Sequence, residues 1–205
     1  MKHAMMTVLL GAMAAVALPA SAQFDRLMKS DSKSESSAGI TADDLVKRYV
    51  SGARTVLKAN YSMLDAVGLK TEAAIASAQA SNLTEGATKE SLEATSKVQT
   101  DSSKALEARL ADGSTKMDAA SKKRFAAGVV DLAKGVITYV SLGRDAKGFK
   151  PGMRDMGSAG GAVYVASSLP SSTSNLANTL KLAIDFCKSN QIPVPKEAND
   201  ATSMI

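Results

Sequence analysis

Histidine, the side chain most used for proton transfer near neutral pH, occurs once in this chain, as His3. It falls inside a stretch, residues 1–22, with the three parts of an export signal: basic Lys2, an apolar run from Met5 to Leu18, and the small residues 20–22. Cleavage after residue 22 removes the histidine. A mature chain without histidine excludes Ser-His-Asp hydrolases and histidine-ligated zinc, copper and haem sites.

The same N-terminal stretch predicts where the protein works. Its apolar run is about 14 residues long, shorter than the roughly 20 that a membrane-spanning helix needs. Cysteine does not follow the cleavage pattern, which argues against a lipid anchor. We therefore predict a cleaved signal peptide and a periplasmic or secreted bacterial protein. We also expect no transmembrane segment after cleavage.

Nucleophilic and acid-base candidates are few in the rest of the chain. Cys187 is the sole cysteine, so an intramolecular disulfide and a CxxC motif are excluded. It lies on the apolar face of a predicted helix, which favours a packed, inert thiol over a nucleophile. The carboxylates Asp43, Asp44, Asp145 and Asp155 are better explained as a helix cap and solvated loop charges than as a pair across a cleft. We expect no enzyme, no cofactor and no metal site.

A basic, glycine-rich segment is the first candidate for binding. It contains Arg144, Lys147, Lys150 and Arg154 shortly before Ser158, which lies in the run 157–161. If a helix begins there, its free amides and the cations could hold a phosphate or carboxylate. A plain connector between two helices is the simpler interpretation.

Asn60 is the second candidate for ligand binding, because it interrupts the apolar face of the first predicted helix. A cap of Thr41 with Asp44 begins that helix, and Gly68 ends it. Its apolar residues share one half of the circumference: Leu45, Val46, Tyr49, Val50, Ala53, Val56, Leu57, Tyr61, Leu64 and Val67. A buried amide there either fixes helix register or contacts a ligand, and we favour the register role.

Residues 70–124 are helix-forming but only weakly amphipathic. Leu92, Leu106 and Leu110 fall on one stripe, although Thr95, Gln99 and Ser102 lie near the same stripe. Such a face predicts a partly solvated hairpin arm. Breaks are expected at 82–86 and around Gly113.

Apolar spacing becomes strong again from Phe125 to Leu142, which predicts a buried helix. Gly128 and Gly135, one heptad apart, would allow close helix contact. The alternative is a short β-hairpin around 136–165, in which residues 136–140 pair with residues 162–165.

The C-terminal third predicts two more helices. One runs from Ser158 to Leu169 and stops before Pro170; the other begins near Ser172 or Thr173 and runs to about Ser189.

The chain thus predicts an all-α protein, a helical bundle of about four to six helices with one Gly/Lys/Arg-rich interior loop. We expect a flexible leader at 23–40, a single helical domain at 41–195 and a polar C-terminal tail at 196–205.

Two functional classes fit this organisation. Without Lys2, 24 basic and 20 acidic side chains give a net charge of +4, too mild and too dispersed to indicate nucleic acid. The favoured class is a non-catalytic interaction or scaffold protein that binds an envelope protein. The other is a carrier of a small anionic or amphiphilic, lipid-like ligand held between the helices. The sequence leaves assembly open and allows a homodimer, because a weakly amphipathic arm can pair with a second chain.

Overall fold

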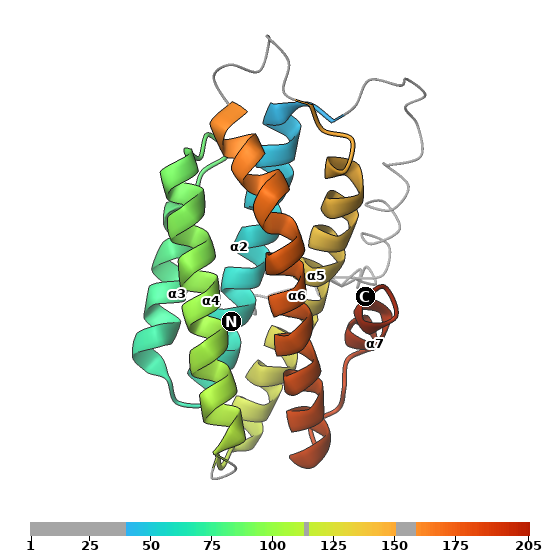
Figure 1. Ribbon diagram of the computed structural model, residues 1–205. Coiled ribbons are helices and arrows are strands. Elements are labelled where there is room, and N and C mark those ends of the chain that lie inside the picture. The colour runs from blue at the N-terminus through green and yellow to red at the C-terminus, as the bar shows by residue number, and fades with distance from the viewer. Residues whose placement is uncertain (1–39, 113–114, 151–158) are drawn as a thin grey trace, which may run out of the picture. The chain divides into compact units, whose positions relative to one another are not determined.

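The protein is an all-α helical bundle, as predicted (Figure 1). The computed structural model describes residues 40–112, 115–150 and 159–205, which form six α-helices and no strand. The helices are α2 (Ala42–Ala66), α3 (Lys70–Asn82), α4 (Lys89–Ala111), α5 (Ala119–Ala146), α6 (Ala159–Ser189) and α7 (Lys196–Thr202). The alternative β-hairpin was wrong, because residues 136–140 lie in α5 and residues 162–165 in α6. The predicted signal, 1–22, and the leader up to residue 39 lie outside the described residues.

Helix α2 is the central element, and it contacts α3, α4, α5 and α6. Its predicted cap is confirmed: Thr41 Oγ1 accepts a hydrogen bond from the Asp44 amide at 3.1 Å and donates to the Asp44 carboxylate at 2.7 Å. The helix ends at Ala66, and Gly68 follows with a φ of +86°, a conformation that favours glycine. Figure 1 shows α2, α4 and α6 running in one direction, with α3 and α5 opposite.

Glycines let α5 approach α2 closely, as the sequence predicts. A Cβ added at Gly128 would lie 2.5 Å from Met63 Cγ, and one at Gly135 would lie 2.5 Å from Val56 Cγ2. Both distances are too short for any side chain larger than hydrogen. The glycines therefore determine how closely the apolar faces of α2 and α5 can pack against each other.

The α3–α4 hairpin differs from the predicted solvated arm. Its breaks fall where expected, after Asn82 and after Ala111. Helix α3 is indeed largely solvated, with Ala73 and Ala76 its buried residues. Helix α4, however, packs against both α2 and α6 and buries Leu92, Thr95, Gln99, Ser102, Ser103 and Leu106. The polar stripe faces the core rather than water.

Two boundaries in the C-terminal half were wrong. The buried helix was expected to end at Leu142, but α5 continues to Ala146. The two predicted C-terminal helices are one, because α6 runs from Ala159 to Ser189 with Pro170 inside it. A proline in a helix interior costs about 3 kcal/mol. Burial of apolar residues on the same helix before and after the proline, at Leu169 and Leu176, offsets that cost.

The last residues differ from a plain polar tail. Residues 196–202 form α7, whose Ala198 and Ala201 are buried, and this helix contacts α5 and α6. Small side chains allow a seven-residue helix to dock although it carries few apolar atoms. The helical domain therefore includes this segment.

Helix α5 is long and apolar enough to cross a membrane, the one such helix in the part of the chain that the structure describes. The sequence predicts no membrane-spanning segment after residue 22. Half of the most apolar window of α5 is buried in the bundle (50%). It contacts α2, α6 and α7, and a core helix meets the same test of length and composition.

Candidate functional site

The cations of the predicted anion site lie at the end of α5. Arg144 is in the last turn, Lys147 is the C-cap residue, and Lys150 follows; all three are exposed. Positive charge near a helix C-terminus is favourable by itself, so their position needs no ligand to explain it. Arg154 and Ser158 lie outside the described residues, so the anion site stays a prediction.

The carboxylates considered for catalysis lie apart in the fold. Asp43 pairs with Lys47 at 2.7 Å within the first turn of α2, while Asp44 serves the cap. Asp145 pairs with Arg48 at 2.7 Å. Asp155 lies outside the described residues. The three described carboxylates thus have ordinary structural partners, in line with the cap and surface roles that we expect.

Cys187 is a buried thiol on α6. Burial raises its pKa to about 11, so the thiolate that would act as nucleophile is scarce at neutral pH. Within the described ranges, groups of three or more His, Cys, Asp or Glu side chains that could hold a metal ion do not occur.

Asn60, the remaining candidate, is 1% exposed on α2. Neither its Oδ1 nor its Nδ2 has a hydrogen-bond partner within the protein. A buried polar group left in this state costs about 1–3 kcal/mol. The sequence favours a role for Asn60 in fixing helix register, and that role needs a hydrogen bond to a neighbouring helix. Because this bond is missing, the structure favours the other interpretation, contact with a ligand.

A second buried amide, Gln99 of α4, joins three helices. Its Nε2 donates to the Ala53 carbonyl on α2 at 3.3 Å and to the Tyr139 hydroxyl on α5 at 3.2 Å. The Tyr139 hydroxyl in turn approaches Gln99 Oε1 at 3.4 Å. The ring of Tyr139 stacks on that of Tyr49, with 5.2 Å between centroids. Gln99 therefore places a polar network in the centre of the bundle.

Burial controls the chemistry of this network. It raises the pKa of Tyr49 to about 12 and that of Tyr139 well above its usual range, because the phenolate is poorly solvated in the core. The Tyr49 hydroxyl lies beside the hydroxyls of Tyr139 and Ser96, yet makes no hydrogen bond of ordinary geometry. Both phenols are neutral at physiological pH, so the network offers hydrogen bonds rather than charge.

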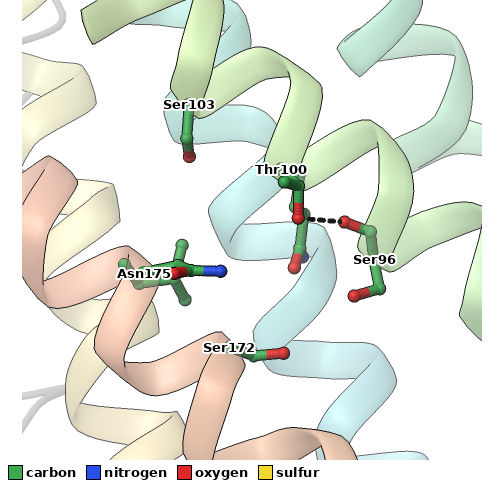
Figure 2. A pocket seen from close by; sticks show the side chains of 7 residues that line it. Ser96, Thr100, Ser103, Ser172 and Asn175 are labelled. Carbon is green, nitrogen blue, oxygen red and sulfur yellow. Dashed lines mark hydrogen bonds between the residues drawn. The ribbon is translucent and has the colours of Figure 1, made fainter.

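A shallow pocket connects this network to the surface between α4 and α6. Figure 2 shows polar side chains of the two helices directed toward the space between them. The lining residues are Ser96, Gln99, Thr100 and Ser103 of α4 and Ser172, Asn175 and Leu176 of α6. Its volume is about 10 Å³, which is room for one water molecule. The lining is uncharged, so the pocket suits one small, neutral hydrogen-bonding group.

Of the residues that line this pocket, the sequence singles out Gln99, which shares the stripe of Leu92 and Leu106 with Thr95 and Ser102. The sequence predicts that this stripe faces water, whereas in the structure it is buried. Spacing places residues on one face of a helix; it does not say what covers that face.

Comparisons with known proteins add no family. No protein-family model matches this chain, and neither a curated protein nor a solved structure is significantly similar to it.

Proposed function

We propose that the mature chain is a non-catalytic protein of the bacterial envelope that works by binding another protein along the surface of α4 and α6. The export signal at residues 1–22 supports the compartment. Its removal, and with it the loss of histidine, supports a binding role over catalysis.

The exposed face of α6 carries the proposal. Residues 159–180 contain no charged side chain, although 22% of the whole chain is charged. The exposed residues of this stretch are Gly160, Val163, Ser167, Pro170, Ser171, Ser174, Asn175 and Asn178. The centres of protein interfaces are depleted in charged residues. A long uncharged face beside a polar pocket is therefore a suitable surface for a protein partner.

The size of the pocket favours a protein partner over a carried ligand. A site that encloses a small molecule has a volume of roughly 300–1,000 Å³. The pocket between α4 and α6 has about 10 Å³. A carrier would need the bundle to open, whereas a protein partner can use the surface as it stands.

Cross-linking in intact cells tests the surface. A photo-reactive residue at Ser174 of α6 should give an adduct with a second protein, and one at Ser51 on the exposed side of α2 should not. Adding a charge to the face by Ser171→Glu should abolish the adduct, while the matched change Ser51→Glu should leave it unchanged. Equal adducts from both positions, or an adduct that Ser171→Glu leaves intact, would contradict the proposal. An adduct of two copies of this chain would replace the proposed partner by the homodimer that the sequence allows.

Native mass spectrometry of freshly purified protein tests the alternative. We expect the mass of the polypeptide without a small-molecule adduct. A ligand that leaves only on denaturation would overturn the interaction proposal in favour of the carrier.

A further inference from the structure

Helices α2 and α4 meet in one constant register. Gln99 Nε2 donates to the carbonyl of Ala53, and these two residues are 46 positions apart. Seven residues earlier on each helix, Val46 and Leu92 both lie beside Gly161 of α6. A Cβ added to this glycine would lie 3.5 Å from Val46 Cγ2 and 3.4 Å from Leu92 Cδ1. The same offset therefore relates α2 to α4 at two successive levels.

The next level of this register leaves the Asn60 amide against a hydrocarbon side chain. Because α2 and α4 run in the same direction (Figure 1), the same offset places Asn60 beside the buried Leu106. Neither polar atom of the amide has a hydrogen-bond partner within the protein. The Tyr49 hydroxyl is in a similar state, since it lies beside Ser96 of α4 without a hydrogen bond of ordinary geometry. Helix α4 thus covers two polar groups of α2 and does not replace the hydrogen bonds that water would make.

The contact between α4 and α6 is also poor in apolar atoms. Small hydroxyl side chains such as Ser103 and Ser172 line it, and they leave the pocket of about 10 Å³ between the two helices. The buried leucines of α4, Leu92 and Leu106, lie toward its two ends, and the buried residues between them are polar. The middle of α4 therefore gains little from burial of apolar surface when it packs on the bundle.

The α3–α4 hairpin is attached to the bundle at one end and held by a side chain at the other. Both attachments lie together, because Arg109 Nε in the last turn of α4 donates to the carbonyl of Val67, which follows α2, at 3.2 Å. Gly68, between α2 and α3, has a φ of +86°, so this connection is a turn that glycine makes without strain. At the far end of α3, Arg54 of α2 donates to the Leu83 carbonyl from Nε at 2.8 Å and from Nη2.

We propose that the α3–α4 hairpin is a hinged flap, which swings away from α2 and α6 as one body about Gly68 and is latched by Arg54. The bond from Gln79 Nε2 to Thr95 Oγ1, at 2.8 Å, joins α3 to α4 and keeps them together. Opening gives water access to the two unpaired polar groups of α2, and this hydration offsets part of the apolar burial that is lost. The remaining helices keep their own contacts, since α2 meets α5 at glycines and a ring of α5 lies 5.0 Å from a ring of α6.

The flap goes beyond the proposed function, because its opening is a property of the chain alone and needs no partner. It also has a consequence for the proposed binding surface. Since α4 and α6 both belong to that surface, opening would separate its two halves, and a partner that contacts both helices would favour the closed flap.

Hydrogen exchange of the purified protein, resolved by proteolysis and mass spectrometry, tests the latch. Arg54→Ala should speed exchange in α3 and in α4 by the same factor, about tenfold, because the bond that opening must break is gone. Lys58→Ala is the matched control. Lys58 lies one turn further along α2 and pairs with Asp131 of α5 at 3.6 Å, so its loss should leave exchange in the hairpin unchanged. Faster exchange in α3 without α4, or in all helices equally, would overturn the flap.

Tyr49→Phe tests the opposite direction and keeps the proposal falsifiable if Arg54→Ala does not fold. The substitution removes a hydroxyl that the closed flap leaves unpaired and that opening would hydrate. Closure therefore becomes more favourable, and exchange in α3 and α4 should slow about fivefold. Unchanged or faster exchange in the hairpin would contradict the proposal.

Thiol labelling measures the opening directly. Ser102 of α4 is 4% exposed, so a thiol introduced by Ser102→Cys reacts only when the hairpin leaves the bundle. Cys187, buried on α6, is the reference in the same chain. After each rate is divided by its value in the unfolded chain, we expect the introduced thiol to react about tenfold faster than Cys187 or more. Equal protection at the two positions would show that the bundle opens as a whole, and would overturn the flap.

Discussion

At the scale of single residues, two buried amide side chains, Gln99 and Asn60, differ in their hydrogen bonding. Gln99 is one methylene longer than an asparagine, and it reaches a carbonyl on α2 and a hydroxyl on α5. Asn60, equally buried, reaches no partner. The longer side chain links three helices by hydrogen bonds, whereas the shorter one leaves a buried donor and a buried acceptor without a hydrogen-bond partner.

The buried tyrosines predict how stability depends on pH. The pKa of Tyr49 is about 12 in the folded protein, against about 10 for an unfolded chain, so the folded state holds its proton more tightly. The resulting stabilisation is fully present below pH 10 and is lost as the pH rises toward 12. For Tyr49 the loss is about 2–3 kcal/mol, and urea unfolding at a series of alkaline pH values measures it.

Tyr49→Phe provides the control for this dependence. Phenylalanine keeps the stacking on Tyr139 but cannot ionise. We expect the decline of the unfolding free energy between pH 10 and 12 to become shallower, with Tyr139 responsible for what remains. An unchanged slope would show that the Tyr49 hydroxyl is solvated.

At the scale of helices, the bundle has one tightly packed pair, α2 and α5, and one loosely packed pair, α3 and α4. Glycines bring α5 against α2, and large apolar side chains fill the space around them. The α3–α4 hairpin buries two leucines of α4, Leu92 and Leu106, and otherwise alanines, hydroxyls and an amide. Packing that relies on short polar side chains gains little from burial of apolar surface.

Two glycine substitutions on α5 test the tight pair. Gly128→Ala should destabilise the protein by about 1–3 kcal/mol, because the added methyl group overlaps Met63. Gly143→Ala, on the same helix with no atom near its Cβ, should stabilise by about 0.5–1 kcal/mol. Denaturant unfolding of both variants measures the contrast. If both substitutions stabilise, the close approach of α2 and α5 is wrong.

Hydrogen exchange tests the loose pair. We expect the amides of α3 and α4 to exchange about tenfold or more faster than those of α2 and α5, since the hairpin has few buried apolar contacts. Measurement by mass spectrometry after proteolysis resolves the four helices. Equal protection in α4 and α2 would mean that the polar seam is as stable as the apolar core.

At the scale of the whole molecule, the proposed function rests on two features of composition. The single histidine lies in the segment that the signal would remove, and the helical domain presents one long uncharged face on α6. An uncharged face of this kind, beside a pocket of about 10 Å³ in the described part of the chain, fits the proposed contact with another macromolecule better than the enclosure of a ligand.

Processing of the signal is directly measurable. We expect intact-mass analysis of protein from the periplasmic fraction to give a chain that begins at Gln23, because small residues at 20 and 22 define the cleavage pattern. Ala20→Arg should block cleavage and retain the full-length mass, while Ala20→Ser should be processed normally. A periplasmic chain that still begins at Met1 would contradict the signal assignment.

The sequence by itself determined the helical class, the cap at Thr41 and the stop at Gly68, because each depends on residues within a few turns of one another. It also indicated that Gly128 allows a close helix contact, but that the partner is Met63 of α2 follows only from the packing. It also placed Asn60 on a buried face.

Only the tertiary structure decided the rest. Helix α6 continues through Pro170 because distant helices bury its apolar stripe on both sides of the proline. The polar face of α4 became the lining of a site because α2 and α6 cover it, through contacts such as the one between Gln99 and Ala53, 46 residues apart. Spacing along a helix specifies which residues share a face; the neighbour that covers the face follows from packing of the whole chain.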